Sequence, residues 1–207
     1  MNNLQKRILT SIAIFPLSIF FVFQGGYILL SFLLAIFFIA NYELFSVFKK
    51  NSNILFLDLV LILALFSIYY LAENSLWLLL WVIILVICSD IGGYVFGKIF
   101  KWKKLTKISP KKTYAGVFGS FFLPFITGLV IYEYQYTDQI PAKGVYFLII
   151  VLFISLISQI GDLIISYFKR KAKLKDTGKI LPGHGGLLDR IDGIIFVFPF
   201  IYLIIIV

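Results

Sequence analysis

Apolar residues form long, nearly unbroken runs along this chain, and the polar residues gather in the short segments between them. A helix needs about 20 residues to cross the hydrocarbon core of a bilayer. The pattern predicts seven spanning helices, at 8–23, 27–48, 54–72, 75–96, 114–132, 144–168 and 190–207. Only Gln-Gly-Gly separates the first two runs, which predicts a tight helical hairpin. No small-residue cleavage site follows the first run, so we interpret it as a retained span rather than a secretory signal.

The composition supports a membrane protein. Of the 207 residues, 61% are hydrophobic and 14% are charged, which is more apolar surface than a soluble domain of this size can bury. We therefore expect an all-α, polytopic integral membrane protein that forms one domain over residues 1–207. Within it, residues 1–88 are expected to be a transmembrane scaffold, 89–193 to carry the chemistry, and 190–207 to form the last span. Cys88 is the one cysteine, which excludes an internal disulfide.

The basic residues fall on one side of the predicted membrane. With the N-terminus inside, every one of the 19 Lys and Arg residues except Lys143 lies in an inward-facing segment. Cytoplasmic loops of membrane proteins are enriched in Lys and Arg, so this separation predicts a cytoplasmic N-terminus and an outward-facing C-terminus. It also accounts for the net charge of +9 without a nucleic-acid partner, because the charges lie in loops between spans.

Four acidic residues occur near the cytoplasmic ends of predicted spans, at a similar membrane depth. Asp90 lies near the end of the fourth span, Asp162 near the end of the sixth, and Asp189 and Asp192 open the seventh. Acids inside spans are costly and usually functional. Converging carboxylates favour a hard divalent cation such as Mg²⁺, which takes one or two carboxylates together with substrate phosphates.

The alternative is that such acids pair with nearby bases and only anchor helix ends. We favour this alternative for Glu43 and Asp58, which lie at similar depth on other predicted spans. His184 is the one histidine and stands between glycines. We expect it to contact or orient a phosphate rather than to hold the metal.

A second basic segment, "KISPKKTYAG", precedes the fifth predicted span. Lys111, Lys112 and Thr113 stand at the expected helix N-terminus, where free backbone N–H groups favour phosphate. The two lysines are equally compatible with simple topological anchors. The glycines of "SDIGGYVFGK" are likewise compatible with close helix packing or with a backbone that approaches a ligand.

Together these residues predict a pocket at the cytoplasmic face with metal-binding acids and phosphate-binding bases, open to lipid. Such a pocket suits phosphoryl or nucleotidyl transfer. No segment of the chain reads as a soluble nucleotide-binding domain, so a lipid is the expected second substrate.

The segment "SYFKRKAKLKDTGKILPGHGGLLDRID" resembles the signature of the phosphatidate cytidylyltransferase family, also called CDP-diacylglycerol synthases. The matching positions are Ser166, Lys169, Arg170, Lys175, Asp176, Pro182, His184, Gly185, Gly186, Asp189, Arg190 and Asp192. "SDIGGYVFGK" and "ISPKKT" resemble the other two motifs of that family, in the same order. The resemblance covers about the second half of the chain.

The resemblance implies transfer of CMP from CTP to phosphatidate with Mg²⁺, and a second cation such as K⁺ in some members. It implies metal ligation by Asp162, Asp189 and Asp192, and catalytic roles for these acids, Lys169, Arg170 and His184. Phosphate contacts would come from Lys111, Lys112, Thr113, Ser166, Lys175 and Arg190, with support from Asp90, Asp176, Gly185 and Gly186. It further implies an inner-membrane protein with a cytoplasmic active site, and a homodimer is compatible with it.

The chain departs from the family pattern at Ala115, where members usually have Glu. Two other readings stay open. A CTP-dependent kinase acting on a polyprenol or similar lipid alcohol would have to activate a hydroxyl, and the Asp-Arg-x-Asp signature argues against it. A transporter with an anion-binding cytoplasmic face would usually show inverted repeats and polar residues at mid-membrane, and neither is visible here.

Overall fold

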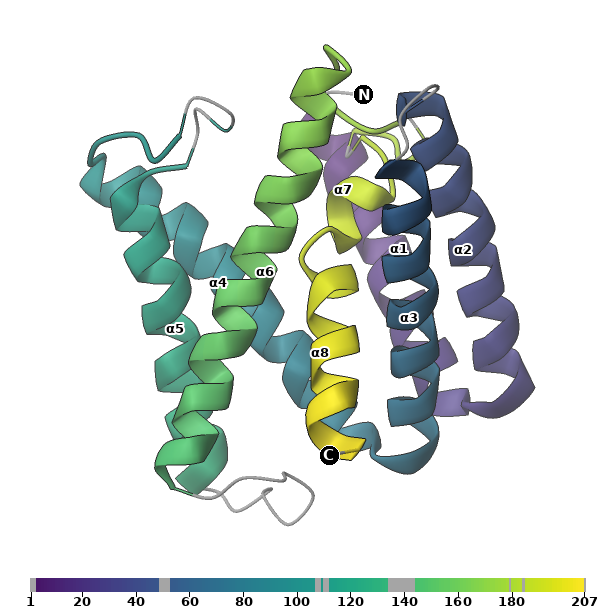
Figure 1. Ribbon diagram of the computed structural model, residues 1–207, viewed down its shortest axis with the longest axis horizontal. Helices are drawn as coiled ribbons and strands as arrows, with labels where there is room; N and C mark the ends of the chain where they lie inside the picture. The colour runs from purple at the N-terminus through teal and green to yellow at the C-terminus, as the bar shows by residue number, and fades with distance from the viewer. Residues whose placement is uncertain are drawn as a thin grey trace.

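The computed structural model describes residues 3–48, 53–106, 109, 112–133, 144–178, 180–183 and 185–206. The described residues form helices that run alternately up and down (Figure 1). In order these are α1 (Asn3–Gln24), α2 (Gly26–Phe48), α3 (Asn53–Asn74), α4 (Leu76–Phe100), α5 (Tyr114–Glu133), α6 (Val145–Lys171), α7 (Leu188–Ile191) and α8 (Ile194–Ile206). The predicted all-α membrane fold is confirmed.

Five helices in the described part of the chain, α2 to α6, are long and apolar enough to cross a bilayer. Shorter apolar helices at 12–24 and 194–205 coincide with the first and last predicted spans. The total of seven spans and the sides on which the termini lie stay predictions. The hairpin between α1 and α2 is present, and its turn needs glycine because Gly25 and Gly26 have φ of +63° and +51°.

The last predicted span, 190–207, is not one continuous helix. α7 ends at Ile191 and α8 begins at Ile194. The break lies against α6, because a Cβ on Gly193 would stand 2.5 Å from Oγ of Ser158. The chain can pass this close to α6 only as glycine, and the break leaves Asp192 between the two helices.

α4 and α5 pack against each other through glycines. A Cβ on Gly92 would collide with the carbonyl oxygen of Gly119, and a Cβ on Gly119 would collide with that of Gly92. A Cβ on Gly116 would lie 2.8 Å from the carbonyl oxygen of Gly93. Glycines of α4 and α5 therefore allow close backbone contact between the two helices, which is one of the two roles considered for the glycines of "SDIGGYVFGK".

A core of buried apolar side chains joins α4 to α2, α3, α6 and α8. It includes Phe147 of α6, which stacks on Trp81 of α4 with ring centroids 5.2 Å apart, and the fully buried Phe198 of α8. α4 crosses behind α6 obliquely, so that α4 and α5 diverge from the remaining helices towards the end where α7 lies (Figure 1). That end carries the segments that follow α4 and α6, and with them the charged motifs.

Candidate active site

A cavity of about 370 Å³ opens at this charged end, between α4, α5, α6 and the α7 region. Most of the residues predicted from the motifs line it. These are Asp90, Lys112, Thr113, Asp162, Lys169, Asp176, Asp189, Arg190 and Asp192. Residues from three separate motifs therefore meet in one place, although more than 100 positions separate Asp90 from Asp192 along the chain.

Other predicted residues lie elsewhere. Arg170 is exposed near the end of α6 and donates to the carbonyl oxygen of Leu174, just after the helix, at 3.2 Å. Lys175 is exposed and is not among the described residues that line the cavity. Lys111 and His184 fall outside the described residues, so their predicted roles stay predictions.

One side of the cavity is formed where α5 begins. Thr113 accepts the N–H of Gly116 at 3.1 Å, which caps the N-terminus of α5. The preceding residue, Lys112, places its ammonium group 2.7 Å from Oδ2 of Asp162 on α6. The start of α5 thus places a lysine ammonium group beside a carboxylate on the neighbouring helix α6.

The acids of the cavity are held close to one another. Ser166 donates to Oδ1 of Asp162 at 3.2 Å, one turn along α6. Asp90, Asp162 and Asp192 are near enough for their negative charges to repel. Such a group of carboxylates in a partly buried place attracts a cation or a proton, and Lys112 partly meets that need.

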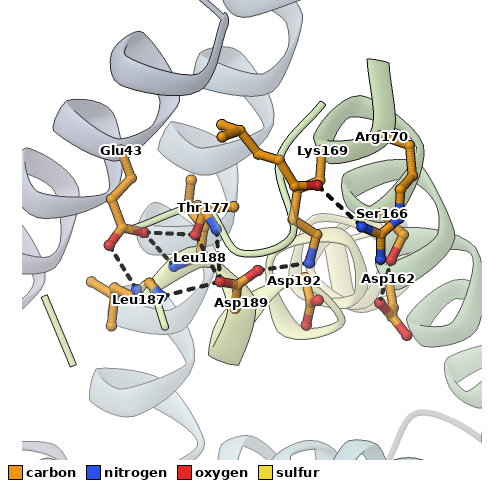
Figure 2. Close-up of polar contacts among 12 residues, drawn as sticks. Glu43, Asp162, Ser166, Lys169, Arg170, Thr177, Leu187, Leu188, Asp189 and Asp192 are labelled. Carbon is orange, nitrogen blue, oxygen red and sulfur yellow. Dashed lines mark hydrogen bonds and ion pairs between the residues drawn. The ribbon is translucent and has the colours of Figure 1, made fainter. Parts of the chain in front are cut away.

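Lys169 and Asp189 form a second ion pair, in which Nζ lies 2.6 Å from Oδ1 (Figure 2). Oδ2 of Asp189 accepts the N–H groups of Thr177 and Gly186, at 2.8 and 3.0 Å. Burial opposes the charged carboxylate, but Lys169 and the two N–H groups outweigh it and hold the pKa of Asp189 below its ordinary value. Asp189 is thus an ionised anchor for both Lys169 and its loop.

Sequence reasoning placed Glu43 among helix-end anchors paired with bases, and this was wrong. Neither ion pair found among the described residues involves Glu43. Its buried carboxylate instead accepts hydrogen bonds from Thr177, Leu187 and Leu188 (Figure 2). The sequence shows that Glu43 lies near the end of a predicted span, but no sequence pattern predicts these hydrogen-bond partners.

Several polar residues of the cavity were not predicted as site residues: Ser89, Tyr94, Ser109, Ser120 and Gln159. Ser89 precedes Asp90 and is 1% exposed, and its hydroxyl has no hydrogen-bond partner in the described part of the chain. Gln159 lies one turn before Asp162 on α6. A buried hydroxyl without a partner is unfavourable, so Ser89 is available to a bound group.

The donor set of the cavity suits a hard cation that is shared with substrate. Among the described residues, no three His, Cys, Asp or Glu side chains are grouped closely enough to hold a metal ion alone. Mg²⁺, however, characteristically uses one or two protein carboxylates and completes its shell with water and substrate phosphates. Asp162 and Asp192, with Asp90 nearby, provide such oxygen ligands.

Comparison with known proteins agrees with this site. The model of the family described as "Cytidylyltransferase family" matches residues 53–207, which include the whole cavity lining. The chain belongs to the cytidylyltransferase family.

Relatives in this family carry the name phosphatidate cytidylyltransferase. The protein of that name from Rickettsia felis is 32% identical over 98% of this chain and 92% of its own length. The one from Bacillus subtilis is 43% identical over 55% of this chain, and the one from Staphylococcus aureus strain COL is 38% identical over 67%. The matched parts span 42% and 52% of those two proteins, about half of their length.

Proposed function

We propose that this member of the family transfers CMP from CTP to phosphatidate, which gives CDP-diacylglycerol and pyrophosphate. The observation that carries the proposal is a cavity at the charged end of an apolar helix bundle, where acids and bases of three motifs meet. The names of the bacterial relatives support the choice of substrates. A lipid substrate also suits a site at the end of membrane helices.

The reaction requires charge neutralisation more than proton transfer. A phosphate oxygen of phosphatidate attacks the α-phosphorus of CTP, and the bond from that phosphorus to the oxygen bridging to the β-phosphate breaks as pyrophosphate leaves. The nucleophile is already anionic at neutral pH, so it needs no strong general base. Lys112, Lys169 and Arg190 line the cavity and would offset the charge of the two approaching anions.

Asp162 and Asp192 would hold Mg²⁺ together with substrate phosphates, and Asp90 would support them. The bound ion would polarise the phosphoryl oxygens and neutralise developing charge. Asp189 was the third predicted ligand, but its oxygens already accept bonds from Lys169, Thr177 and Gly186. We assign Asp189 the role of positioning Lys169. A second cation such as K⁺ and a homodimer stay predictions.

The cavity would face the cytoplasm of a bacterial inner membrane. The described basic residues that follow α4 and α6 lie at its end of the bundle, and Lys and Arg are enriched on the cytoplasmic side of membranes. This orientation gives CTP access from the cytoplasm and phosphatidate access from the bilayer.

The purified full chain, reconstituted in lipid nanodiscs with labelled CTP, phosphatidate and Mg²⁺, tests the proposal. We expect CDP-diacylglycerol and pyrophosphate in equal amounts. A phosphorylated lipid alcohol with CDP, formed when a polyprenol replaces phosphatidate, would instead identify a lipid kinase. Binding of anions without any product would favour a transporter and would contradict the proposal.

A further inference from the structure

We propose that Glu43 is a positioning residue for the reaction: it fixes the loop that carries Thr177 and Asp189, and through Asp189 it orients Lys169 in the cavity. Glu43 lies on α2, outside the residues 53–207 that the family model matches. The kinetic part of this inference rests on the proposed function, whereas the structural part does not.

The Glu43 carboxylate is buried, and both of its oxygens accept hydrogen bonds. The residue is 1% exposed. Oε1 accepts the N–H of Leu187 at 2.9 Å, and Oε2 accepts the N–H of Leu188 at 2.9 Å and the hydroxyl of Thr177 at 3.1 Å. Burying a charge is costly unless it is hydrogen-bonded, and hydrogen bonds to an ionised acceptor are among the strong ones. The loop and α2 therefore hold each other in one arrangement.

The loop is shaped to admit this carboxylate. A Cβ on Gly178 would lie 2.5 Å from Oε1 of Glu43, and a Cβ on Gly186 would lie 2.5 Å from Oε2. A Cβ at either position would therefore displace the Glu43 carboxylate, and the two glycines leave room for it where the backbone closes around it. Gly186 belongs to the Gly-Gly pair of the signature segment, so part of that signature serves contact with α2.

A continuous chain of contacts leads from Glu43 to the cavity. The Thr177 hydroxyl lies 3.1 Å from both Oε2 of Glu43 and Oδ2 of Asp189. The hydroxyl has one proton and donates it to one of these oxygens at a time. The Thr177 N–H donates separately to Oδ2 of Asp189 at 2.8 Å. Asp189 then holds the ammonium group of Lys169, which is 8% exposed and lines the cavity. Since Lys169 has a long flexible side chain, its direction depends on this partner.

Glu43→Gln tests the inference with little change in shape. In either orientation the glutamine amide turns an NH₂ group towards the N–H of Leu187 or Leu188, so at least one bond is lost. We expect faster hydrogen exchange at these two amides. We also expect kcat to fall by about 10-fold, because small misplacements of catalytic groups are costly. The matched control is Glu73→Gln, since Glu73 also accepts a backbone N–H, that of Gly26 at 2.6 Å, but at the opposite end of the bundle, where α2 begins and α3 ends. This control should keep wild-type kcat.

The structural part and the kinetic part of the inference are tested by different measurements. Unchanged exchange at Leu187 and Leu188 in Glu43→Gln would overturn the contact itself, and this readout holds whether or not the wild type turns over CTP. Faster exchange with wild-type kcat would overturn the positioning role. Inactive wild-type protein would instead count against the proposed function.

A double variant separates positioning from a general structural role. If Glu43 acts through Asp189, Glu43→Gln combined with Asp189→Asn is no slower than Asp189→Asn alone. Multiplied losses would overturn the route through Asp189. If Glu43→Gln fails to fold, Thr177→Val provides the test instead. It removes the hydroxyl that lies between Glu43 and Asp189 and keeps the shape of the side chain. Wild-type kcat in folded Thr177→Val would then overturn the inference.

Discussion

The ammonium group of Lys112 lies 2.7 Å from Oδ2 of Asp162, which ties the start of α5 to α6 across the cavity. The pair joins a residue of the "ISPKKT" motif to an acid that precedes the signature loop. A bound phosphate would compete for Lys112, and a bound cation would compete for Asp162. The pair therefore presents the two charges that the proposed substrates and metal require, already placed opposite each other.

Lys112→Ala should raise the KM for CTP about 10-fold or more, because a hydrogen bond to a charged group contributes roughly 1.5–3 kcal/mol. The measurement is initial rate against CTP concentration at saturating phosphatidate. Lys104→Ala is the matched control, since Lys104 is an exposed lysine of the same segment and is not among the described residues of the cavity lining. Equal effects in both variants would show that only overall surface charge matters.

Asp162→Asn and Asp192→Asn should each lower turnover by about 100-fold or more, as expected when charge stabilisation at a reacting centre is lost. Both variants should still elute as folded protein in detergent. Activity measured against Mg²⁺ concentration should show a raised requirement where residual activity remains. Asp58→Asn on α3, away from the cavity lining, serves as the control. Near-normal rates in both cavity variants would refute the proposed metal ligands.

Asp189 should contribute stability that acid removes. Its pKa is below the ordinary value of about 3.9, so the contribution is complete above that value and is lost as pH falls through the lower, folded-state pKa. Wild type should therefore melt at higher temperature than Asp189→Asn near neutral pH, and the gap should narrow below about pH 4. Thermal melts in detergent across this range provide the measurement, and a gap that stays constant with pH would contradict the assignment.

Ala115→Glu should destabilise the protein. Ala115 is 1% exposed on α5 and is not among the described residues that line the cavity. A glutamate there would bury a charge and overpack the helix contact, each of which is unfavourable. Melting temperature and yield should both fall, and Ala115→Gln, which adds the same bulk without charge, should fall less. A stable and active Ala115→Glu protein would show that this position does open towards the acids of the cavity.

The features that depend on local pattern could be predicted from the amino-acid sequence. Run length and apolar content predicted where the helices lie, and Gly25 and Gly26 marked the hairpin. A shared predicted membrane depth selected Asp90 and Asp162 as candidates for one site, and a predicted helix N-terminus added Lys112. Such features are readable because membrane insertion acts on each segment of about 20 residues separately.

Which polar groups contact each other depends on how the helices pack. The Glu43 carboxylate bonds with Thr177, 134 positions away, and with Leu188, 145 positions away. Whether an acid holds a metal, pairs with a base or accepts backbone N–H groups depends on what the packed helices bring within about 3 Å of it. The close approach of Gly193 to Ser158, at the break between α7 and α8, is likewise a contact between distant parts of the chain. A linear pattern carries no record of these contacts, because it does not determine which faces of distant helices come together.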